Sequence, residues 1–173
     1  MSLDHVIGRD PETVARLDGV IREALDGVGL EYERVEEGAF LVKLAGQHKL
    51  ATMTWLVVGD HTLLVEAFFM RRPESNDGGT YGFLMQRNAR TYGVHFSCDR
   101  LGDVYLVGHV PLHAVTAEEV DRLLGCVLEY ADTTFDAALR LGFAESMRRE
   151  EEWRAKQAAE GGAPLRPIFG GEP

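Results

Sequence analysis

The sequence predicts an α+β fold: an antiparallel sheet of about six strands with an N-terminal helix, a short connecting helix and a long C-terminal helix, in the order α-β-β-β-β-α-β-β-α. Amphipathic segments with a period near 3.6 residues lie at both ends of residues 10–142, and the segments between them alternate with a period of two. Short turns join those alternating segments, which favours antiparallel neighbours.

The first helix is predicted to begin at Asp10 and Pro11, an N-cap residue followed by a proline at the first helical position. Gly29 is placed to end it. The apolar positions between them recur at three- and four-residue steps and so share one face: Val14, Leu17, Ile21, Ala24, Leu25 and Val28.

Four strands are predicted next. Residues 30–35 and 40–45 alternate, and the turn Glu36-Glu37-Gly38 joins them as a hairpin. A third strand over 50–58 and a fourth over 62–70 are apolar on both faces near their centres. We therefore expect helices to cover one side of the sheet and something else, such as a partner subunit, to cover the other.

The remaining elements are a connecting helix, two strands and the long helix. Helical spacing from Tyr81 to Tyr92 predicts the connecting helix, with Pro73–Gly79 as a loop before it and Gly93 ending it. The pattern in residues 95–98 and 104–110 predicts a hairpin. Thr116 with Glu119 forms a capping box, and a stripe of apolar residues continues from it to residue 139.

Gly142 interrupts that stripe, which predicts a domain over residues 10–142. Residues 143–160 are charge-rich and read as a solvated helical extension, supported weakly by charge pairs four residues apart. Residues 161–173 are dense in glycine and proline and are expected to form a disordered tail.

The charge balance excludes several classes of function. Eighteen Lys plus Arg face 28 Asp plus Glu, a net charge of −10, which repels nucleic acid and anionic membranes. No apolar run is long enough to cross a bilayer, and residues 1–10 lack the pattern of a secretory signal. Two cysteines are consistent with a reducing compartment. We expect a cytoplasmic protein with no nucleic-acid or membrane partner.

Several short segments resemble the YbjN family, which is described as bacterial sensory transduction regulators. They are Leu84-Met85-Gln86-Arg87-Asn88, residues 96–99, residues 102–108, Pro111, residues 116–119 and Leu123-Leu124. The resemblance covers about Val14 to Leu139, and the order of elements is similar to that of class I type III secretion chaperones. It implies a chaperone-like fold and supplies no catalytic residues. Asn88 also has a structural interpretation, as a side chain that satisfies backbone groups.

No catalytic, cofactor or metal site is predicted. The chain has no Gly-x-Ser-x-Gly elbow, Walker loop or Gly-x-Gly-x-x-Gly fingerprint. His109 and His113 are four apart but are separated by Pro111 at a strand end, so they do not share a helical face as zinc ligands would. His95 and Cys98 are three apart in a strand and point to opposite faces.

Two polar features are candidates for a binding site. Glu66 lies in an apolar strand, where it is either a carboxylate with a raised pKa or, more commonly, a residue facing solvent or a neighbouring Arg. A second candidate is an anion or partner contact formed by four arginines near the connecting helix; unrelated solvated arginines are the other interpretation. These arginines are Arg71, Arg72, Arg87 and Arg90.

The leading interpretation is a non-enzymatic protein-binding or regulatory module that binds an unidentified protein partner and forms a homodimer. The predicted interface is either the sheet surface or the first and connecting helices. On the sheet, its candidate apolar residues are Met53, Trp55, Val57, Leu64 and Phe68. The opposite faces of the same two strands, with Leu56, Val65 and Phe69, are the alternative surface. The alternative is an enzyme or small-ligand regulator with a pocket between the sheet and the long helix.

Overall fold

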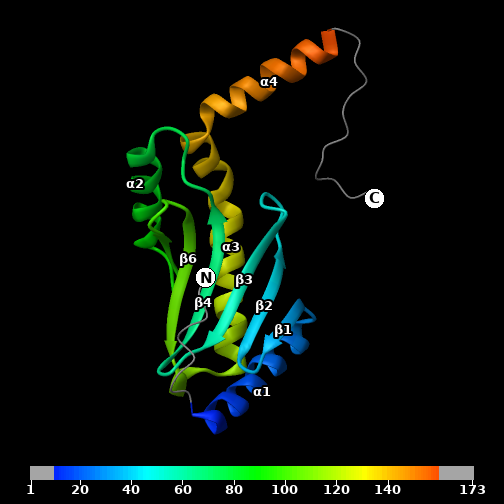
Figure 1. Ribbon diagram of the computed structural model, residues 1–173, viewed down its shortest axis with the longest axis vertical. Coiled ribbons are helices and arrows are strands. Elements are labelled where there is room, and N and C mark those ends of the chain that lie inside the picture. The colour runs from blue at the N-terminus through cyan, green and yellow to red at the C-terminus, as the bar shows by residue number, and fades with distance from the viewer. Residues whose placement is uncertain (1–9, 160–173) are drawn as a thin grey trace.

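The computed structural model describes residues 10–159, and the predicted tail over 161–173 lies outside them. Figure 1 shows one antiparallel sheet with its helices. The strands are β1 (Glu31–Glu36), β2 (Ala39–Ala45), β3 (Ala51–Val58), β4 (Thr62–Met70), β5 (His95–Cys98) and β6 (Val104–Pro111). The helices are α1 (Pro11–Val28), α2 (Asp77–Asn88), the 3-10 turn η1 (Leu112–Ala114), α3 (Ala117–Gly142) and α4 (Ala144–Ala159).

The strand order in the six-stranded sheet is β1-β2-β3-β4-β6-β5, and every neighbouring pair is antiparallel. The predicted fold class and element order are therefore confirmed. Short turns join β1 to β4 into a meander. After the connection through α2, β6 pairs with β4, and β5 lies outside β6 at the edge of the sheet.

Local sequence signals start and end α1 as predicted. The Asp10 carboxylate accepts a hydrogen bond from the Thr13 backbone N–H at 3.0 Å, and Gly29 ends the helix in the left-handed conformation at φ 67°. The buried face of α1 packs against α3, and both helices cover the same side of the sheet. In Figure 1 the strands pass in front of α3.

Helix α3 begins at the predicted cap, where Thr116 accepts a hydrogen bond from the Glu119 backbone N–H at 3.1 Å. The capping box is only half formed, because the Glu119 carboxylate accepts hydrogen bonds from Tyr92 and Arg122 instead. The apolar stripe of α3 is buried against the sheet, with Leu123, Leu124 and Val127 at its centre.

The connecting helix α2 differs from its prediction at both ends. It begins at Asp77, inside the predicted loop, and ends at Asn88, before Tyr92. Asn76, in the left-handed conformation, supplies the carbonyl that accepts the first helical hydrogen bond, from Thr80. Tyr92 is held outside the helix because its backbone N–H donates to the hydroxyl of Tyr130 on α3.

Gly142 ends α3 against the loop that precedes α2. Its carbonyl accepts hydrogen bonds from the backbone of Glu74 and Ser75, and an added Cβ would lie 3.0 Å from Pro73. Beyond it, α4 extends away from the sheet in Figure 1. None of the described helices is long and apolar enough to span a membrane. The limits of the domain at residues 10 and 142 stay a prediction.

Candidate partner-binding face

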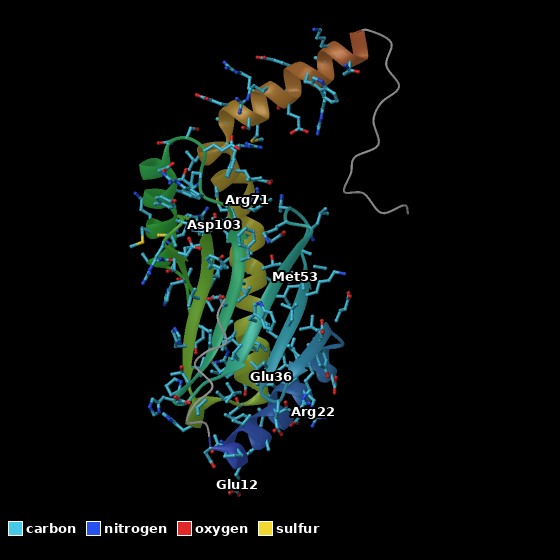
Figure 2. All side chains as sticks on the ribbon, viewed as in Figure 1. Glu12, Arg22, Glu36, Met53, Arg71 and Asp103 are labelled. Atoms are coloured by element: carbon cyan, nitrogen blue, oxygen red, sulfur yellow. The ribbon has the colours of Figure 1, made fainter. Side chains whose placement is uncertain are left out.

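The two faces of β3 have different surroundings. Thr52, Thr54 and Leu56 point toward the helices and are buried. The alternate residues, Met53 and Trp55, point to the opposite side, where Met53 is 40% exposed and Trp55 half-buried. Figure 2 labels Met53 on its strand. The described helices thus leave one side of the sheet uncovered.

We call this side the open face. Strand register places its central residues in rows: Trp55 is opposite Leu41 and Glu66, and Glu66 is opposite Val107. On the next row Phe68 is opposite Tyr105, and their rings make an edge contact at 5.6 Å. The open face is defined by eight residues: Leu41, Met53, Trp55, Leu64, Glu66, Phe68, Tyr105 and Val107.

All five residues of the predicted interface point to this side of the sheet. Met53 and Phe68 are each 40% exposed, Trp55 and Leu64 are half-buried, and Val57 is buried at 7% and offers little surface. Sequence reasoning missed Leu41, Tyr105 and Val107, which the strand register places on the same side. Whether these residues form an interface stays a prediction.

Glu66 is the charged residue at the centre of the open face. Its direct neighbours across the sheet are Trp55 and Val107, so no arginine lies opposite it. Among the described residues, no hydrogen bond or ion pair joins the Glu66 carboxylate to another group. The half-buried Glu66 carboxylate, which lies among apolar side chains, is therefore available to interact with water or with a partner.

The buried carboxylate of Asp18 on α1 holds the β1–β2 hairpin, which forms one edge of the sheet. Asp18 on α1 accepts hydrogen bonds from Arg22, from Arg34 and from the Gly38 backbone N–H at 2.8 to 3.0 Å. Burial raises the pKa of Asp18, but the hydrogen bonds from Arg34 and Gly38 and the charges of both arginines outweigh it. The pKa of Asp18 is consequently held below its ordinary value of 3.8.

A half-buried lysine positions the end of β4. The Lys49 ammonium donates to the carbonyl of Ala51 at 3.0 Å and to that of Phe68 at 3.2 Å, and it lies 5.8 Å from the Phe135 ring centroid. Burial lowers the pKa of Lys49. Asp132 on α3 accepts the Lys49 backbone N–H at 2.9 Å. Helix α3 thereby holds the strand segment that presents Phe68.

The four predicted arginines lie at different ends of α2. Arg72 contacts Asp77 at the start of the helix at 3.0 Å, and its backbone N–H donates to Asp103. Arg71 and Asp103 are labelled near one another in Figure 2. Arg87 lies over the Phe83 ring near the other end of α2, about 15 Å along the helix from Asp77 by its rise per residue. Arg90 follows that end and is exposed. Anion or partner binding at these residues stays a prediction.

A small apolar cleft of about 60 Å³ lies between α2 and β5. Neither Glu66 nor any of the four arginines lines it, so it does not correspond to the pocket expected between the sheet and the long helix. Among the described residues, no three His, Cys, Asp or Glu side chains are grouped as metal ligands would be. The residues that line the cleft are Tyr81, Leu84, Met85, Phe96, Ser97, Cys98 and Val104.

Comparisons with known proteins agree with the predicted resemblance. The YbjN family model, described as "Putative bacterial sensory transduction regulator", matches residues 18–140. "Uncharacterized protein Rv0487" of Mycobacterium tuberculosis (strain ATCC 25618 / H37Rv) is 46% identical over 140 residues, 78% of this chain and 76% of that protein. "Uncharacterized protein ML2442" of Mycobacterium leprae (strain TN) is 40% identical over 148 residues, 83% of this chain and 80% of that protein.

Solved structures show the same fold at low sequence identity. The Yersinia pestis type III secretion chaperone SycH, in complex with a fragment of YscM2, superposes with a TM-score of 0.52 at 14% identity, over 68% of this chain and 98% of that chain. A chain of the ExsC–ExsE complex gives a TM-score of 0.52 at 19% identity, over 71% and 93%. At these identities the likeness establishes the fold alone.

Proposed function

The chain belongs to the YbjN family, and from this premise we propose that it is a non-enzymatic, cytoplasmic protein-binding module that holds a segment of a partner protein on its open face. The observation that supports this most directly is the exposure of Met53 and Phe68 beside half-buried Trp55. A large contiguous apolar patch is uncommon on a monomeric protein and usually marks a site of interaction.

The fold neighbours are consistent with this proposal. They are chains of protein complexes: SycH with a fragment of YscM2, and ExsC with ExsE. YscM2 and ExsE are seen with SycH and ExsC, and neither is assigned to this chain. For this chain, the shared architecture supports the more general idea that such a sheet presents a protein-binding surface, with α1 and α3 serving as its support.

An enzyme or small-ligand regulator is the alternative function. It needs a pocket that combines apolar walls with a few convergent polar groups. The cleft between α2 and β5 is lined mostly by apolar residues, and Glu66 lies instead on the open face. These positions favour the protein-binding function.

A second copy of the chain is a further candidate partner, because a twofold axis lets one apolar surface serve both subunits. We propose a homodimer through the open face as this second candidate. Size-exclusion chromatography with light scattering measures it: a mass near twice that of the monomer supports the dimer, and a monomer mass at micromolar concentration contradicts it.

Affinity capture with the tagged full chain tests the binding surface. The variant Met53→Asp with Phe68→Asp should lose proteins that the wild type retains from a lysate of cells that make it. The control is Leu50→Asp with Leu101→Asp, which adds the same charge at apolar residues 68% and 74% exposed elsewhere. Equal capture by both variants would contradict the proposal.

A further inference from the structure

We infer that Trp55 and Glu66 form a cation-accepting site at the centre of the open face, and that the partner segment supplies an arginine or lysine among apolar residues. This inference rests on the proposed function and specifies the chemistry of the partner. It also identifies Glu66 as a determinant of specificity among the apolar residues at the centre of the open face.

The geometry of the pair supports this role. Trp55 and Glu66 are direct partners in the β3–β4 register and point to the same side of the sheet. Side chains opposite each other in an antiparallel pair have Cβ atoms about 5 Å apart. A cationic group placed between them contacts the indole ring and the carboxylate together, since cation–π contacts extend to about 6 Å from the ring centroid.

Desolvation of the Glu66 carboxylate on binding makes the pair selective for a partner that carries a cation. Among the described residues the Glu66 carboxylate has no ion-pair partner, and its neighbours on β3 and β6 are Trp55 and Val107. An entirely apolar partner would strip water from this charge without compensation, which is unfavourable. A cation at this point restores the lost interaction. Arginine fits best, because its planar group stacks on aromatic rings and pairs with carboxylates.

The wider charge distribution points to a basic partner. The chain has a net charge of −10, which attracts cationic segments at long range. A second copy would bring a second Glu66 and the same net charge to the interface. The nearby cation Lys43, on β2, is already paired with Glu31 at 2.9 Å. A basic, apolar segment of another protein is therefore the expected occupant of the open face.

Peptide display on the full-length protein tests this inference. A library of random 12-residue peptides on phage is selected against the wild type, and clones that lose binding to Met53→Asp with Phe68→Asp are kept as ligands of the open face. We expect the kept sequences to place one arginine or lysine between apolar residues. Tryptophan fluorescence in the Trp153→Phe background should respond to these peptides through Trp55.

Affinities of the synthesised peptides then isolate the role of Glu66. Glu66→Gln should weaken binding about 10- to 100-fold, the usual range for losing a charge-assisted interaction. Glu66→Lys should weaken it further, and replacing the basic residue of the peptide by Glu should restore binding to that variant. Glu33→Gln is the matched control, since Glu33 lies across from Leu41 at the sheet edge and is exposed. It should change affinity less than about twofold.

The results distinguish failure of the cation-site inference from failure of the proposed protein-binding function. Ligands of the open face that lack a basic residue, or that bind Glu66→Gln as tightly as the wild type, overturn the inference and leave the proposed function standing. A selection that yields no peptide sensitive to the Met53 and Phe68 changes contradicts both. Circular dichroism melting of every variant separates loss of binding from loss of folding.

Discussion

The side-chain amide of Asn88 pairs with both backbone groups of Phe96. Its Nδ2 donates to the Phe96 carbonyl at 3.0 Å, and its Oδ1 accepts the Phe96 N–H at 2.8 Å. Phe96 lies in β5, the edge strand of the sheet. The amide thus takes the place of a neighbouring strand and closes this edge to another chain. The two Phe96 backbone groups are therefore not available to pair with a partner strand.

Asn88→Ala should destabilise the protein by about 1–3 kcal/mol, because it leaves two part-buried backbone groups without their partner. It should also increase aggregation by exposing the edge of β5. Urea unfolding and light scattering measure the two effects. Gln86→Ala, an exposed change on the same helix, is the control. Equal stability of the two variants would show that the amide contributes nothing.

Asp18→Asn should lower the free energy of unfolding by about 1–3 kcal/mol at neutral pH, since it removes the charge that Arg22 and Arg34 contact. The pKa of Asp18 is lowered in the folded state, so its stabilisation is present above the ordinary value of 3.8 and is lost as the pH falls through the folded pKa. The difference from wild type should therefore shrink below pH 3.8. Asp121→Asn, at an exposed site, should show no such trend. A difference independent of pH would contradict this reasoning.

Leu124→Ala should cost about 2–5 kcal/mol, because this α3 side chain is 2% exposed and its removal leaves a cavity. Leu128→Ala, one turn further along and half-buried, should cost about 1 kcal/mol. Denaturant midpoints rank the two variants. The reverse order would mean that the buried face of α3 is assigned incorrectly.

Removal of residues 144–173 should leave a folded domain with a melting temperature within about 4 °C of the full chain. The described part of α4 interacts with the rest of the protein at partly or fully exposed side chains, such as Ser146 and Arg149 with Glu74. Phe143, which packs against the core, is retained. A fall beyond about 8 °C would show that this segment stabilises the domain.

Local signals made much of the fold predictable. The caps at Asp10 and Thr116 act within one helical turn, so the sequence alone locates the starts of α1 and α3. Strand alternation likewise placed Met53 and Trp55 on one face of the third strand, whereas the register of β3 with β4 was needed to place Phe68 on the same side. The start of α2 was not predictable in this way, because Asn76 adopts a left-handed conformation without a side-chain cap.

The long-range polar contacts were beyond sequence reasoning. Asp18 looks like an ordinary position on an amphipathic helix, and its burial depends on Gly38, twenty residues away. The backbone-satisfying interpretation of Asn88 is confirmed, but its partner Phe96 follows only from the packing of α2 beside β5. The isolation of Glu66 required the strand order, which places Val107 opposite it.

Site-specific photo-crosslinking tests whether the open face is the binding surface. A benzophenone amino acid replaces Phe68 on the open face or, as control, Leu101 in the β5–β6 turn, and the full chain is irradiated in cells that make it. Both positions are exposed, at 40% and 74%. We expect a discrete crosslinked product from position 68 that Met53→Asp abolishes, with none from position 101. A folded protein that gives no product from position 68, or the same product from both, would contradict it.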